Sequence, residues 1–252
     1  SGMPGEIICF TYLGMLTGEK IFDEIAFKAL NHITIDIESS FESIKETGIF
    51  GGWGSIIYLF AVLSRIRKSD ILIDLAVSWL KKIRACELTA KETNHGLVSG
   101  SAGLIISLVA AYKVSKNELF MELAIKLSGN LLRCAYQTKD QIKWKGYSKH
   151  PLAGLSHGAS GFALCYARLF DVTGDKKYKD VVEKIINYEN HLFNSDYRNW
   201  PDLRDFVLEN NNNNTFFSTA WSHGAPGIGL ARLEIIKHGI SSRKIKKDLK
   251  VS

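Results

Sequence analysis

Two histidines stand in matching positions beside glycine-rich stretches of the chain. His157 directly precedes the first glycine of a G-x-x-G unit in "GLSHGASG". His223 does the same in "TAWSHGAPGIG", where Trp221 and Ser222 come just before it. An imidazole has an ordinary pKa near 6.5, so it can accept or donate a proton at neutral pH. We therefore predict that His157 and His223 face one another and divide two proton transfers. The alternative for each is a structural histidine that hydrogen-bonds within a turn.

The glycine units recur and indicate the fold that must position these histidines. A G-x-x-G unit followed by an apolar, helix-length run starts near residues 51, 100, 158 and 224. Spacings of this size, with loops of unequal length, are typical of repeat architectures. Each apolar run is followed by a segment that is polar on one face, such as "DKKYKDVVEKIINYENHL". The sequence predicts an all-α fold, an α/α toroid of helical hairpins with buried inner helices; an open solenoid is the alternative.

The ends of this domain are also predicted. Residues 1–19 are expected to be an N-terminal extension that begins with a tag remnant, Ser1-Gly2, and residues 20–252 to be the helical domain. The segment after Ser115, with Glu118 three residues on, predicts a capping box for an outer helix. The final "SSRKIKKDLK" predicts an outer helix without a following inner partner, so the ring is expected to be incomplete or open. An exposed inner face would favour self-association.

The four glycine motifs resemble a known family. "GIFGGWGSI", "GLVSGSAGLI", "GLSHGASG" and "AWSHGAPGIG" occur in this order and together resemble the cyclase domain of lanthipeptide synthetases, the LanC-like family, over about residues 20 to 240. The resemblance implies an α/α barrel that closes thioether rings in a dehydrated precursor peptide. In that reaction a cysteine thiol adds to a dehydroalanine or dehydrobutyrine. It further implies, for zinc-dependent members, a cysteine after the tryptophan, a Cys-His pair in a fifth motif and an aspartate before the second motif.

The chain departs from the zinc-dependent pattern at three places. Ser222 stands at the position of the metal-binding cysteine, and the chain ends in "KDLKVS" without a fifth motif. Gly96 stands at the aspartate position, with His95 and Asn94 beside it. A serine hydroxyl is a poor zinc ligand, so we expect no metal and no other cofactor.

These matches define a predicted site. His157 and His223 are the expected catalytic residues, and Trp221, Ser222 and His95 are the expected substrate-binding residues. A cysteine thiol, with a pKa near 8.5, is already partly ionised at neutral pH, so positioning it against the alkene could supply much of the rate without zinc.

In lacking these zinc ligands, the chain resembles the cyclase domains of class III lanthipeptide synthetases, which follow lyase and kinase domains in one polypeptide. On that resemblance, these domains are expected partners, and lanthionine or labionin ring formation is the expected activity. The alternative is a degenerate cyclase fold that binds or scaffolds the precursor peptide. An α/α-toroid glycoside hydrolase ranks last, because none of the glycine turns carries an acidic residue.

Composition excludes several other classes of protein. The chain of 252 residues is 46% hydrophobic and 23% charged, which is ordinary for a soluble globular protein. No apolar run is long enough to span a bilayer. The four scattered cysteines predict buried, reduced thiols in a cytoplasmic protein. The net charge of +6 comes without a nucleic-acid recognition motif, so it favours an acidic peptide partner over nucleic acid. Residues 210–214, five asparagines, predict a surface loop.

Overall fold

Almost all of the regular structure is helical. The computed structural model describes residues 2–85, 95–146, 148–212 and 214–252. The inner helices are α1 (Met3–Thr17), α3 (Trp53–Arg67), α5 (Ser101–Ser115), α7 (Ala159–Thr173) and α10 (Ala225–Lys237). The outer helices are α2 (Lys20–Ser39), α4 (Ile71–Ala85), α6 (Glu118–Arg133), α8 (Lys176–His191) and α11 (Arg243–Asp248). A 3₁₀ turn (Phe41–Ser43), the short α9 (Asp205–Asn210) and a hairpin of β1 (Tyr136–Gln137) and β2 (Ile142–Lys143) complete these ranges.

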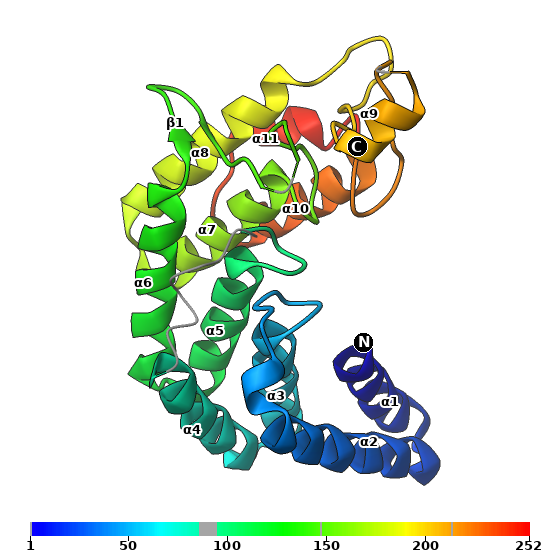
Figure 1. The fold of residues 1–252 in the computed structure, drawn as a ribbon, viewed down its shortest axis with the longest axis vertical. Helices are drawn as coiled ribbons and strands as arrows, with labels where there is room; N and C mark the ends of the chain where they lie inside the picture. Colours follow the sequence, from blue (N-terminus) through cyan, green and yellow to red (C-terminus); the bar gives the residue numbers. More distant parts are fainter. Residues whose placement is uncertain (1, 86–94, 147, 213) are drawn as a thin grey trace.

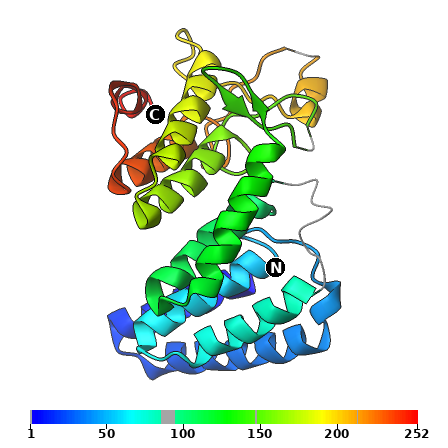
Figure 2. The ribbon, with the colours of Figure 1, turned by 90° about the vertical axis from the view of Figure 1, so that its left-hand side faces the viewer.

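The hairpins are arranged as an arc. Each inner helix packs against the next, in the order α1, α3, α5, α7 and α10, and each outer helix packs against the inner helix of its own hairpin. Figure 1 shows α1 and α10 at the two ends of the arc, with the outer helices around it. The side view in Figure 2 shows how the successive hairpins stack from the N-terminal to the C-terminal pair. The predicted toroid of hairpins is the observed fold, and no helix in the described ranges is both long and apolar enough to cross a membrane.

The burial patterns explain why the two rows differ. In α3 nearly every residue from Trp53 to Ser64 is buried, as expected for a helix covered on several sides. In α8 only one face is buried, including Tyr178, Val182 and Ile185, and Asp175 caps the helix by accepting from the backbone N–H of Lys177 at 3.0 Å. The two kinds of helix therefore pack as an apolar inner row covered by an amphipathic outer row.

Three local predictions need correction. Ser115 does not cap α6; it ends α5, and Asn117 is the cap because Lys116 takes a left-handed conformation (φ 57°) that separates the helices. Residues 1–19, expected as an extension, contain α1, which packs on α2 and α3 through a narrow stripe at residues 4, 7, 11 and 14. Buried thiols were expected, but Cys9 and Cys134 are exposed and Cys165 alone is buried among the described cysteines. Cys86 and Asn94 lie outside the described residues.

The second glycine of each motif lies against a backbone carbonyl. A Cβ atom added to Gly54, Gly103, Gly161 or Gly227 would lie within 2.5 Å of the carbonyl oxygen of Thr47, Leu97, Leu155 or Trp221, respectively. Real Cβ atoms do not approach backbone so closely, so these positions admit only glycine. The first glycine of the fourth motif, Gly224, also has φ 90°, a conformation that side chains disfavour. The chain is thus pressed closely against each inner helix at its start.

We predict that Gly161→Ala destabilises the protein by about 2–3 kcal/mol, because the new methyl group would overlap the Leu155 carbonyl. Urea unfolding followed by circular dichroism measures this. Gly129→Ala within α6 is the matched control, since its Cβ would meet nothing closer than 3.9 Å. There the helix should gain about 0.5–1 kcal/mol. Equal stability of the two variants would contradict the close approach.

Candidate functional site

The turns that precede the inner helices are joined by backbone hydrogen bonds. The N–H of Ile49 donates to the carbonyl of Leu97 at 3.2 Å. The N–H of Val98 donates to Ser156 at 3.2 Å, and that of Ser156 donates to Ser222 at 3.1 Å. All four turns therefore meet on the side of the arc where the inner helices begin, which we call the turn end. Residues that are 48 to 66 positions apart in sequence become neighbours there.

His157 and His223 lie next to one another at the turn end. Their ring centroids are 6.1 Å apart, with an angle of 34° between the ring planes. His157 is half-buried, whereas His223 is only 4% exposed. The structure thus brings together the two histidines that occupy equivalent places in the third and fourth repeats.

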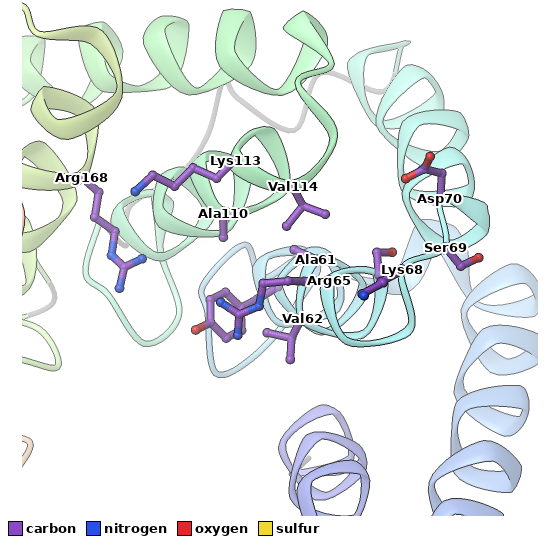
Figure 3. A pocket seen from close by; sticks show the side chains of 12 residues that line it. Ala61, Val62, Arg65, Lys68, Ser69, Asp70, Ala110, Lys113, Val114 and Arg168 are labelled. Atoms are coloured by element: carbon purple, nitrogen blue, oxygen red, sulfur yellow. The ribbon is translucent and has the colours of Figure 1, made fainter. Parts of the chain in front are cut away.

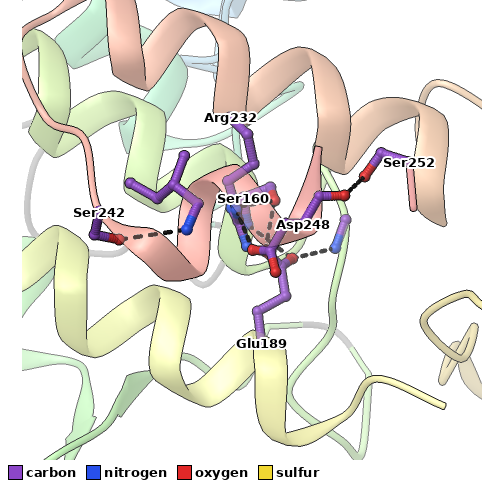
Figure 4. A network of polar contacts seen from close by, with 8 residues as sticks. Ser160, Glu189, Arg232, Ser242, Asp248 and Ser252 are labelled. Atoms are coloured by element: carbon purple, nitrogen blue, oxygen red, sulfur yellow. Dashed lines mark hydrogen bonds and ion pairs between the residues drawn. The ribbon is translucent and has the colours of Figure 1, made fainter. Parts of the chain in front are cut away.

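A buried charge network holds the third turn in place. Arg232 of α10 is fully buried and donates to Glu189 at 2.8 Å and to Asp248 at 2.8 Å (Figure 4). Glu189 in turn accepts from the backbone N–H groups of Gly154 at 2.8 Å and Ser160 at 3.2 Å. These two residues flank His157, so the network positions its turn. Burial raises the pKa of Asp248, and Arg232 opposes that rise.

The fourth turn has a support of its own. The side-chain oxygen of Asn199 accepts from the backbone N–H of Ala225 at 2.8 Å, and its nitrogen donates to the carbonyl of Ser218 at 2.9 Å. These bonds hold both sides of the turn that carries His223. A neutral amide satisfies backbone groups without adding charge beside the imidazoles.

The surroundings keep both histidines neutral at pH 7. Burial lowers the pKa of His223 to about 4; nearby Arg204 and His157 lower it as well, and Asp202 opposes the shift. Burial, followed by Arg204, also lowers the pKa of His157. Ser156 Oγ donates to the Ser222 carbonyl at 3.1 Å and lies 3.4 Å from Nε2 of His223. This assigns the ring proton of His223 to Nε2 and leaves the lone pair on Nδ1.

Asp202 and Arg204 are site residues that sequence reasoning missed. The Asp202 carboxylate is buried and accepts from Nε of Arg204 at 2.9 Å and from Nη2 at 2.6 Å. The backbone N–H of Asp202 donates to the carbonyl of Phe216 at 2.8 Å, which ties this segment to the chain before the fourth turn. An acidic residue therefore reaches the site from outside the glycine turns. No motif marks it, since both residues lie in the long connection between the third and fourth repeats.

Trp221 forms an exposed aromatic pair with Phe50, a third residue that sequence reasoning missed. Their ring centroids are 5.4 Å apart in a stacked arrangement, although Phe50 belongs to the first turn and Trp221 to the fourth. The rings are 56% and 47% exposed, respectively. Two large apolar faces are therefore open to solvent at the turn end, which also carries the buried His223 and the half-buried His157.

The other predicted residues lie less centrally. Ser222 is half-buried and acts through its backbone carbonyl, which accepts two hydrogen bonds from Ser156. His95 is half-buried, and its backbone carbonyl accepts from the N–H of Ala102 at 3.1 Å. Burial lowers the pKa of His95, but no stacking of its ring on either imidazole occurs among the described residues. Its substrate-binding role stays a prediction.

A match to one protein family extends over the full length of the chain. Residues 1–252 match the family described as "Lanthionine synthetase C-like protein". The chain belongs to this family. The LanC-like resemblance of the four glycine motifs is therefore confirmed.

This LanC-like chain is similar to a curated protein in sequence and to solved structures in fold. It is 26% identical over 163 residues to "Lacticin 481/lactococcin biosynthesis protein LcnDR2" of Lactococcus lactis subsp. lactis, covering 61% of this chain and 15% of that protein. The structure of "Nisin cyclase" matches with a TM-score of 0.75 and 17% identity over 98% of this chain and 67% of that chain. Cellobiose 2-epimerase from Bacillus thermoamylovorans B4167 matches with a TM-score of 0.51 and 13% identity, covering 79% of this chain and 58% of that one. Both structures show the same fold.

The donors at the turn end do not fit the zinc site implied for some LanC-like proteins. Ser222 offers a hydroxyl where a thiolate would be needed, and Nε2 of His223 is directed at Ser156. Within the described ranges, no three histidine, cysteine or acidic side chains are grouped so that they could hold a metal.

The buried His223 makes a prediction about pH. Because its folded pKa, about 4, lies below the unfolded value near 6.5, the unfolded chain binds the proton more readily. The stability contribution of neutral His223 is present above pH 6.5 and is lost as the pH falls toward 4. The free energy of unfolding should drop by about 2 kcal/mol more in the parent protein than in His223→Asn between pH 7 and 4.5. Urea titrations at several pH values measure the difference, and parallel curves for both proteins would refute it.

Proposed function

We propose that this LanC-like chain is a lanthipeptide cyclase domain that adds peptide cysteine thiols to dehydroalanine or dehydrobutyrine without zinc. The proposal rests on one observation at the turn end. The ring centroids of the two neutral imidazoles are 6.1 Å apart, and the turn end also carries the exposed rings of Phe50 and Trp221. A single addition gives a thioether ring of the lanthionine type, and a ring of the labionin type forms when the enolate adds to a second dehydroalanine and the proton goes to that residue's α-carbon. The substrate is a dehydrated precursor peptide.

The addition requires one proton to move from sulfur to carbon. His157, the more exposed imidazole, accepts the thiol proton while the sulfur forms its bond to the β-carbon of the alkene. The alkene electrons move to the adjacent carbonyl, which gives an enolate. The histidine pair then returns the proton to the α-carbon. No atom or electron is gained or lost overall, so the reaction needs no co-reactant.

The lowered pKa values suit this sequence of steps. A neutral imidazole is ready to accept a proton at pH 7, and the imidazolium formed is a stronger acid than a free histidine, which favours delivery to carbon. Arg204 carries a fixed positive charge close enough to influence both rings. Its guanidinium is held by Asp202 and can stabilise the negative charge of the enolate.

The relatives support the substrate class. The sequence relative is a lacticin 481/lactococcin biosynthesis protein, of which the chain covers only 15%, and the structural neighbour is a nisin cyclase. Kinase and lyase domains of one synthetase, class III membership, a cytoplasmic location and self-association all stay predictions.

We predict that His157→Asn slows ring closure by about 100-fold to 10,000-fold, the usual worth of a positioned general base. The substrate is a synthetic peptide with one dehydroalanine and one cysteine, and alkylation of unreacted thiol followed by mass spectrometry measures the ring. His223→Asn should also slow closure. Normal closure by both variants would refute the assignment.

Metal and scaffold alternatives are separated in the same assay. Closure by the parent protein should be unchanged by a chelator and should not rise with added zinc. Acceleration only with zinc would contradict the metal-free reaction. Peptide binding without any acceleration would instead establish the scaffold function.

A second substitution tests the aromatic pair. Phe50→Ala should raise KM for the same peptide by about threefold to tenfold with little change in kcat, because an aromatic contact is worth about 0.5–1.5 kcal/mol. Phe27→Ala, at an equally exposed phenylalanine of α2, is the matched control. A rise of KM in both variants, or in neither, would rule out a specific contribution from Phe50.

A further inference from the structure

A basic hollow lies away from the imidazoles, near the other end of the inner helices. It has a volume of about 520 Å³ and is lined by residues of α3, α5, α7 and the turn after α3. The lining residues are Tyr58, Ala61, Val62, Ser64, Arg65, Lys68, Ser69, Asp70, Ala110, Lys113, Val114 and Arg168. We call this the basic hollow. Its size is within the usual range for a ligand site.

Four cations and one carboxylate line the basic hollow. Lys113 is paired with Asp171, and Arg168 lies 3.6 Å from Glu234, both acids being outside the lining. Arg65 donates to the hydroxyl of Tyr12 at 3.2 Å. No carboxylate of the described residues lies within ion-pair distance of Arg65 or Lys68, and both side chains are exposed. Two positive charges are therefore available to a ligand, next to two that are shared with acids.

The cations follow one another across three helices. Figure 3 shows that Arg168 of α7, Lys113 of α5 and Arg65 of α3 lie one after another in space, with Lys68 at the end of α3. Neighbouring packed helices are about 8–10 Å apart, so the row extends over about 20 Å. An extended peptide advances about 3.3 Å per residue, so about six residues would cover it. A phosphate ion would reach only part of the row, which favours an extended acidic segment.

The space between the cations is apolar. Ala61 and Val62 of α3 and Ala110 and Val114 of α5 form this part of the wall. Such a surface can accept the backbone and the methylene groups of glutamate side chains while the carboxylates reach the cations. Single-stranded nucleic acid is bound by stacking successive bases on several aromatic rings, whereas Tyr58 is the one aromatic residue among those that line the basic hollow.

We propose that the basic hollow binds an acidic segment of a peptide, with Arg65 and Lys68 as its principal charge contacts. The identity of that peptide rests on the proposed function: for a cyclase it is the precursor peptide. α3 has 15 residues and is therefore about 22 Å long, so the bound segment lies about that far from the turn end. The acidic segment would thus be separated by at least about seven residues from the reacting cysteine.

Binding of fluorescein-labelled octaglutamate to the 252-residue chain tests the proposal by fluorescence anisotropy. The double variant Arg65→Gln/Lys68→Gln should bind about tenfold more weakly. The control Lys126→Gln/Lys176→Gln removes the same charge from exposed sites on α6 and α8 and should bind like the parent protein. Equal affinities of the two double variants would overturn the proposal. Tighter binding of inorganic phosphate, or of an eight-nucleotide oligothymidylate, than of octaglutamate would also overturn it.

A second assay links the hollow to ring closure. The dehydroalanine–cysteine peptide is joined to hexaglutamate through a Gly-Ser linker of about ten residues, which can cover the distance along α3. Arg65→Gln/Lys68→Gln should raise KM for this tailed peptide and leave KM for the untailed peptide unchanged. Identical effects on both peptides would contradict anchoring. Octaglutamate binding does not depend on His157, so failure of the cyclase assignment would leave the binding result intact.

Discussion

The site depends on how closely the turns press against the starts of the inner helices. At four equivalent places the chain's own carbonyl occupies the volume where a side chain would begin, as between Gly161 and Leu155. Because of this closeness, neighbouring turns form hydrogen bonds with one another. The carbonyl of Ser156 accepts from the N–H of Val98, and the N–H of Ser156 donates to the carbonyl of Ser222. Without this closeness the turns would separate, and the two imidazoles would have no common environment. The glycines are therefore a geometric requirement of the site and not merely flexible points in the chain.

The buried charged residues near the third turn contribute more to the positioning of that turn than to the stability of the fold. Arg232 and Glu189 are fully buried, and bringing such charges out of water costs free energy that their attraction only partly offsets. The network fixes the position of the third turn. The two carboxylate oxygens of Glu189 accept hydrogen bonds from the backbone of Gly154 and from the backbone and side chain of Ser160, on either side of His157. Asn199 performs the matching task for His223 without charge. Supports of this kind hold the imidazoles on rigid elements, which a proton transfer over hydrogen-bond distances requires.

The fold and the pairing of the two histidines could be predicted from the sequence because both follow from patterns of neighbouring residues. The G-x-x-G units, the apolar runs after them and the equivalent places of His157 and His223 are visible without coordinates. Sequence reasoning failed where the information is tertiary. Phe50 meets Trp221 only because the first and fourth turns adjoin, and Asp202 reaches His223 from a connection that carries no repeat signal. The helix α1 was missed because its buried stripe, at residues 4, 7, 11 and 14, includes a proline, a threonine and a glycine, which do not read as an apolar face.

The turn end and the basic hollow lie along the same inner helices, and this arrangement bears on how a metal-free site could work. In the proposed metal-free reaction no metal binds and activates the thiol, so a large share of the rate would come from holding thiol and alkene together. A peptide held by its acidic segment would keep its cysteine near the imidazoles at an effective concentration set by the intervening chain, which for short flexible linkers is about millimolar. The anchored segment would stay in place while successive cysteines reach the turn end. Remote binding of this kind raises local concentration without demanding one fixed sequence around each reacting residue, so a single pair of histidines could serve several ring positions.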